Sequence, residues 1–161
     1  MSKDKSSDVS ADASADALAR IILFLLLHNK LPVKERLFRI GLRHDPYCLK
    51  CAGAVVNDMV HFFCSCEAVY NTWSWVKRQV VQLGQMGAGV DDWELVNLCF
   101  SNSCNDAEIV WLVSSYVLYV WEMVQVKKLE VKLDKFFGFL TFKYKMHQAT
   151  SQDQLKNLHY T

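Results

Sequence analysis

The chain has 161 residues, of which 52% are hydrophobic and 12% aromatic, with six glycines and two prolines. This length predicts one domain with room for a sizeable core, and the composition favours a globular protein over a disordered or repeat-built one. The formal net charge is +1, so binding of nucleic acid would have to rest on a local basic patch. The sequence therefore indicates a globular and largely helical protein.

Neither a secretory signal nor a membrane span is expected. Residues 1–16 are polar, and the apolar run 21–27 is only seven residues long and is followed by polar residues. This run and the run 109–121 are both shorter than the roughly 20 apolar residues that cross a bilayer. We therefore expect an intracellular protein, nuclear or cytoplasmic, with no membrane partner. In a reducing compartment, clustered cysteines more often bind metal than form disulfides.

The spacing of apolar residues in the first half predicts an all-α fold. Residues 1–12 carry almost no apolar side chains and are expected to be disordered. A helix is predicted from residue 16 to just before Pro32, because the residue preceding a proline avoids the helical region. A short second helix over 33–40 should end at Gly41.

A loop is predicted over 42–57, in which Gly53 supplies a permissive backbone. Asp58 can cap a short helix that carries His61 inward, and a longer helix should run over 66–83.

The second half is predicted to be helical as well. The segment 84–89 holds three of the glycines and should be a loop, after which Asp91 or Asp92 caps a short helix. The longest predicted helix starts at a cap, Asn105 or Asp106, and runs to about residue 131. Its apolar residues occupy nearly every side of the helix, which is typical of a central helix or of one that contacts a partner.

A last helix is predicted from residue 132 to about 148, and residues 151–161 are expected to fray. The prediction is thus about six helices, with a zinc-binding module over 13–83. A C-terminal helical part over 84–150 is expected to pack on this module.

The most informative motif is C-x2-C-x9-H-x4-C, formed by Cys48, Cys51, His61 and Cys66. Three thiolates and one imidazole have the ligand number and chemistry of a closed structural zinc site, so we predict one Zn²⁺. A closed site holds a fold together and points away from catalysis. The alternative is that Cys64 and Cys66 are packing residues and that His61 is an ordinary helix histidine.

The identity of the fourth ligand depends on local helix geometry. Cys64 lies three residues after His61, so one continuous helix would place both side chains on the same face. Cys66 lies five residues after His61 and can meet it only if the helix ends between them. Ser65 or Cys66 is a plausible cap for such a break, which favours Cys66 and leaves Cys64 as the alternative ligand.

A local basic patch precedes and overlaps this motif. Lys34, Arg36, Arg39 and Arg43 lie close together in the sequence, and a short helix would place Arg36 and Arg39 on one face. Such a patch could neutralise several phosphates of RNA or DNA although the whole chain is nearly neutral. The alternative is a solvated helix face beside a metal site.

These motifs together resemble the zinc-binding domain that follows the reverse transcriptase in non-LTR retrotransposons. The similar features are the segment 31–37 (LPVKERL), the four ligand positions, and Trp73 seven residues after the last cysteine. Leu49 and Glu67 stand where the family often has proline, and both departures leave the ligands intact. The resemblance covers about residues 17–80 and implies a nucleic-acid-binding accessory role.

The sequence predicts no catalysis by this chain. It contains no Tyr-x-Asp-Asp polymerase signature and no endonuclease carboxylate set, and zinc-bound thiolates are not free nucleophiles. The resemblance therefore implies a detached piece of a retroelement protein or a gene derived from one. Two alternatives stay open: a module for protein interaction or self-association through the aromatic helix 109–126, and a decayed retroelement remnant.

Overall fold

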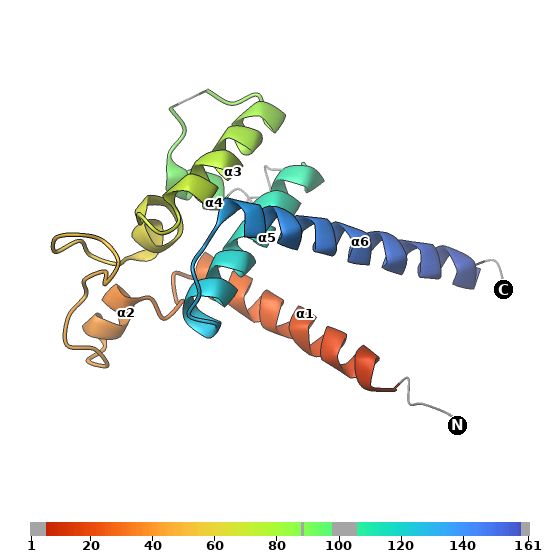
Figure 1. Ribbon diagram of the computed structural model, residues 1–161, viewed down its shortest axis with the longest axis horizontal. Helices are drawn as coiled ribbons and strands as arrows, with labels where there is room; N and C mark the ends of the chain where they lie inside the picture. The colour runs from red at the N-terminus through yellow and green to blue at the C-terminus, as the bar shows by residue number, and fades with distance from the viewer. Residues whose placement is uncertain (1–5, 88, 98–105, 159–161) are drawn as a thin grey trace.

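The computed structural model describes residues 6–87, 89–97 and 106–158 (Figure 1). Over these ranges the protein is mostly helical and has no β-strand, which confirms the all-α prediction in this coarse form. In chain order the elements are α1 (Ser6–Leu27), α2 (Lys34–Arg39), the π-helical turn η1 (His61–Ser65), α3 (Tyr70–Leu83), α4 (Asp92–Asn97), α5 (Ala107–Trp121), the π-helical turn η3 (Glu122–Val126) and α6 (Leu133–Leu158).

Helix α5 lies at the centre of the molecule and contacts α1, α3 and α6 (Figure 1). The ring of Tyr116 on α5 is fully buried, with its centroid 5.3 Å from that of Trp73 on α3 and 5.9 Å from that of Phe136 on α6. Neighbours on several sides explain why the apolar residues of α5 are spread round the helix rather than confined to one stripe.

The continuous helical stretch Ala107–Val126 corrects the expectation that no segment is long enough to cross a membrane. It has 20 residues and a mean hydropathy of 1.5, so it meets the length and composition of a membrane span. The sequence count stopped at residue 121 and therefore missed the five residues of η3. A buried core helix meets the same two criteria, and 44% of an 18-residue window within this stretch is buried inside the protein.

Several helix ends form as local sequence signals predict. The Asp91 carboxylate accepts hydrogen bonds from two backbone amides at the start of α4, and Asp106 does the same for α5. At the end of α2, Gly41 has a φ of +78°. The amide of Gly41 donates to the Phe38 carbonyl and that of Leu42 to the Leu37 carbonyl, which is the hydrogen-bond pattern of a Schellman cap.

The outer helices are longer than their apolar spacing indicates. Helix α1 begins at Ser6, within the segment expected to be disordered, and α6 extends to Leu158, beyond the residue where fraying was expected. The added turns of α1 include Ala11, Ala13 and Ala15, and alanine has the highest helix propensity; the added turns of α6 contain neither glycine nor proline. Apolar periodicity does not register such turns, because their sequences contain few large apolar residues.

Two other boundaries differ because the chain makes π-helical turns. Helix α3 begins at Tyr70 rather than at Cys66, whose backbone is extended (φ −63°, ψ 136°). The longest predicted helix ends as the π turn η3, where the amide of Lys127 donates to the carbonyl of Glu122, and Lys128 then takes a left-handed conformation (φ +55°). No glycine or proline marks this end, so the sequence does not reveal it.

Candidate metal centre

A loop and a helical turn bring four side chains together beside α2. Cys48 and Cys51 lie on a loop whose ends are held by an isolated antiparallel bridge between Tyr47 and Val56. The Cys48 amide also donates to the carbonyl of Val55, and Gly53 has a φ of +84° between the two. A β-carbon at this φ would be strained, so glycine at this position allows the tight turn.

His61 reaches the loop from a helical turn that Asp58 caps, since the Asp58 carboxylate accepts a hydrogen bond from the His61 amide at 2.8 Å. The turn then widens to the π-helical η1, in which the Cys66 amide donates to the His61 carbonyl, five residues earlier. This wider turn brings residues five apart to the same side, and the extended backbone at Cys66 ends it. The predicted break between His61 and Cys66 therefore occurs at Cys66.

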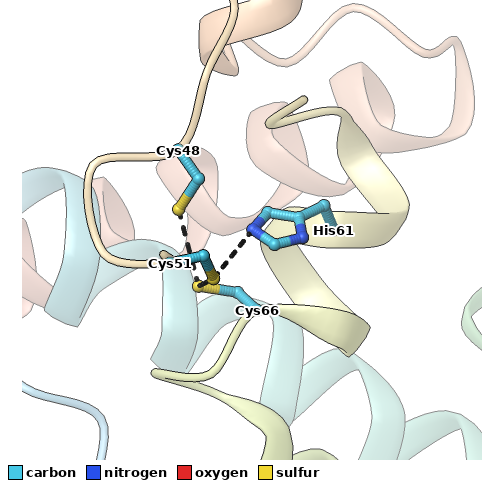
Figure 2. A group of neighbouring side chains, drawn as sticks. All are labelled: Cys48, Cys51, His61 and Cys66. Atoms are coloured by element: carbon cyan, nitrogen blue, oxygen red, sulfur yellow. Dashed lines mark hydrogen bonds between the residues drawn. The ribbon is translucent and has the colours of Figure 1, made fainter. Parts of the chain in front are cut away.

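The ligand atoms of Cys48, Cys51, His61 and Cys66 all lie within 4.8 Å of one another (Figure 2). The Sγ of Cys66 is 3.8 Å from the Sγ of Cys48 and 3.7 Å from that of Cys51. The Sγ of Cys51 is 3.4 Å from Nε2 of His61. Tetrahedral zinc with its usual bond lengths needs separations of about 3.8 Å between sulfurs and about 3.6 Å between sulfur and nitrogen. The four side chains thus fit one zinc ion.

Polar groups around the ligands suit a zinc thiolate site. The amide of Lys50 donates to the Sγ of Cys48, and the amide of Glu67 donates to the Sγ of Cys51, both at 3.4 Å. The other ring nitrogen of His61, Nδ1, lies 3.4 Å from the Ser65 hydroxyl. Such outer contacts orient the ligands and stabilise negative charge on sulfur. The sequence analysis named Ser65 only as a possible helix cap and missed this contact, although its position four residues after His61 was a usable signal.

The pKa values of the thiols show how burial and neighbouring charges affect the formation of thiolates in this cluster. Burial by itself raises the pKa of Cys48, but hydrogen bonds from the Lys50 amide and from His61 outweigh it and lower the pKa to about 7. Burial raises the pKa of Cys66 to about 12, and the negative charge of Cys48 adds to this rise. Three thiolates so close together repel one another, and a bound divalent cation would remove that repulsion.

Cys64, the alternative fourth ligand, does not belong to this group. Its side chain is buried in the core, and burial strongly raises the pKa of its thiol, which keeps it neutral. It therefore behaves as a small apolar packing residue.

Residues 12–73 match the family model described as zinc-binding in reverse transcriptase. This segment is similar to reverse transcriptase zinc-binding domains. The match ends at Trp73, so α4, α5 and α6 lie outside it. Comparison with curated proteins and with solved structures finds no match.

The four predicted phosphate-binding residues of the zinc-binding domain have different surroundings. Lys34 is mostly buried, with 16% of its side chain exposed, and pairs with Asp45 at 2.8 Å. The hydrogen bond from Lys34 is the main cause of the lowered pKa of Asp45. Lys34 therefore ties α2 to the loop that carries the cysteines.

The three arginines are less enclosed. Arg36 is partly buried and donates to the carbonyl of Asn29, between α1 and α2. Arg39 is exposed and pairs with Glu35 one turn earlier on α2. Arg43 is exposed, and no ion pair to it is found within the described ranges. Arg39 and Arg43 are thus the two members of the patch most accessible to a ligand.

Proposed function

We propose that this chain is a zinc-stabilised nucleic-acid-binding accessory module, derived from a retrotransposon reverse transcriptase protein, with no catalytic activity of its own. The metal centre supports this role because all four of its ligands come from the protein. Such a closed site leaves no open position for a substrate or an activated water. It holds the loop against α2 and thereby fixes the basic residues around it.

The observation that carries the proposal is the exposed basic surface beside the metal centre. Arg39 and Arg43 lie on α2 and just after it, and Lys50 lies between the two loop cysteines, with its side chain exposed. A rigid loop presents these cations without the entropy cost of ordering a flexible segment at each binding event. Contacts of this kind with phosphates give affinity that falls steeply with salt.

The test is the salt dependence of RNA and DNA binding by the wild type and by the double variant Arg39→Ala with Arg43→Ala. Each lost phosphate contact should reduce the slope of log K against log salt by about 0.7 for single strands and about 0.9 for duplexes. Arg78→Ala is the matched control, since Arg78 is exposed and belongs to α3 rather than to α2 or the cysteine loop. If the wild type binds no nucleic acid, or if the double variant keeps the full slope, the proposal is wrong.

A second candidate function is protein interaction or self-association, for which the sequence suggested the segment 109–126. Eight residues of α5 are buried, among them Tyr116 and Tyr119, so much of this apolar surface serves the core. Exposed apolar side chains on other helices favour this candidate instead, including Leu18 and Phe24 on α1 and Phe142 on α6. Oligomers that grow with protein concentration, together with an absence of nucleic-acid binding, would support it.

A further inference from the structure

A cleft with a volume of about 260 Å³ lies beside the metal centre. Four parts of the chain line it: α2 and the residues beside it, the loop with Cys48, the turn η1 with Cys66 at its end, and the turn η3 with Lys128, which follows it. The last part lies outside the segment that matches the zinc-binding family. Residues of η3 thus complete the lining of a cleft that the matched segment forms only in part.

The cleft has an apolar lining. Leu37 of α2, Phe62 of η1 and Val124 of η3 all line it, and Leu49 lies at its exposed edge, with 88% of its surface accessible. The volume falls just below the range of about 300–1,000 Å³ that accommodates drug-sized ligands. A cleft of this size and lining suits one flat ring whose faces can pack against apolar side chains.

The charged residues that line the cleft are all cations. They are Lys34, Arg43, Lys50 and Lys128, and no carboxylate lies among the described lining residues. One of the four, Lys34, is already paired with Asp45. A zinc ion held by three thiolates has a net charge of about −1, so the cleft keeps an excess of positive charge when the metal is bound. Its rim is thus complementary to phosphate groups.

The backbone after η3 determines which of two adjacent lysines reaches the cleft. Lys127 pairs with Glu122 at 3.0 Å and does not line the cleft. Lys128, in its left-handed conformation, lines the cleft and lies within 3.4 Å of the Gln125 side-chain oxygen. Of these two adjacent lysines, Lys127 is thus used in an ion pair and Lys128 contributes to the rim of the cleft.

We propose that the cleft holds one unpaired base of a single-stranded nucleic acid, with the flanking phosphates on Arg43, Lys50 and Lys128. This inference rests on the proposed function and names the strand state that it recognises. Bases in a duplex are stacked and paired, so they cannot enter an apolar cleft without being extruded, whereas an unpaired base can enter freely. The cations at the rim match the charges that flank such a base.

The experiment compares three RNA probes: a uridine dodecamer, a dodecamer of the same backbone without bases, and a uridine–adenosine duplex of the same length. Fluorescence anisotropy at fixed salt gives the affinity of each for the zinc-loaded full chain. We expect the uridine dodecamer to bind at least about fivefold more tightly than the abasic strand, since a base contact is worth about 1 kcal/mol or more. The duplex should also bind more weakly than the uridine strand.

Two pairs of variants make the test specific to the cleft. Lys128→Gln should weaken binding of the uridine strand and reduce its salt slope by about 0.7, whereas the adjacent control Lys127→Gln should leave both unchanged. Leu49→Ala should lower affinity for the uridine strand but not for the abasic strand. Because Leu49 is almost fully exposed, this change should not disturb the fold.

The outcomes separate the two proposals. Equal binding of the intact and abasic strands, or equal effects of the two lysine variants, would overturn the cleft assignment, while salt-dependent binding would still support the proposed function. Tighter binding of the duplex would also overturn it. No binding of any probe would overturn both proposals.

Discussion

Replacing Cys66 with serine should remove zinc from the protein, whereas replacing Cys64 with serine should not. The two thiols lie two residues apart, and both are buried, but only Cys66 contributes to the four-ligand group. Zinc at a thousandfold excess over its dissociation constant stabilises the fold by about 4 kcal/mol, and Cys66→Ser should lose most of that. Cys64→Ser buries a hydroxyl in a site made for a neutral thiol, which costs about 1–3 kcal/mol.

Because these two losses of unfolding free energy are of similar size, stability alone does not distinguish the variants. Zinc content after desalting does: we expect one ion per chain for the wild type and Cys64→Ser, and well below one for Cys66→Ser. Urea unfolding with and without a chelator gives a second measure, because a chelator should destabilise only the proteins that hold zinc. Amide hydrogen exchange should then quicken first over residues 42–70.

The opposite pattern would refute the reasoning. If Cys64→Ser loses the metal and Cys66→Ser keeps it, the π turn does not place Cys66 in the site. If the wild type carries no stoichiometric zinc, the assignment of a metal centre itself is wrong.

Three further predictions concern stability, each measured by urea unfolding of the zinc-loaded protein. Tyr116→Phe should cost about 1–3 kcal/mol with unchanged zinc content, because it leaves the buried carbonyl of Phe63 without the hydroxyl that donates to it; no loss would exclude that hydrogen bond. Gly41→Ala should cost about 1–2 kcal/mol from backbone strain alone, because an added β-carbon meets no atom within 4 Å. The control Gly87→Ala should cost nothing, because Gly87 is equally unobstructed and does not have a positive φ. Burial lowers the pKa of Lys143, so the folded protein binds fewer protons than the unfolded chain just below the ordinary lysine pKa, and unfolding free energy should rise with pH there. Lys143→Met should flatten that rise, and an unchanged pH profile would contradict the assignment.

Local spacing predicted the metal ligands because they occupy a short stretch of chain. Cys48 and Cys51 lie three positions apart on one loop. The argument that His61 and Cys66 can meet only if the helix ends between them used local helix geometry and no tertiary information. The caps Asp58, Asp91 and Asp106 could be predicted for the same reason, because a capping side chain accepts hydrogen bonds from backbone amides no more than three residues away.

Contacts with residues distant in the sequence could not be predicted from local patterns. Lys34 looked like a free phosphate ligand, but Asp45 pairs with it across the loop. The sequence left open whether the aromatic helix around Tyr116 is central or contacts a partner, and only the structure shows that α1, α3 and α6 bury much of it. The π turn after Trp121, which has no glycine or proline to mark it, was missed for a different reason: it depends on packing rather than on a local breaker.

By itself the sequence indicated that the chain is helical and that Cys48, Cys51, His61 and Cys66 could hold one zinc ion. Those properties follow from apolar periodicity and from ligand chemistry within a short segment. Only the tertiary structure decided that Lys128 lies with Arg43 and Lys50 around one cleft, because that depends on how η3 packs against the metal-held loop. Contacts between segments so far apart come from the packing of whole helices, which no local pattern encodes.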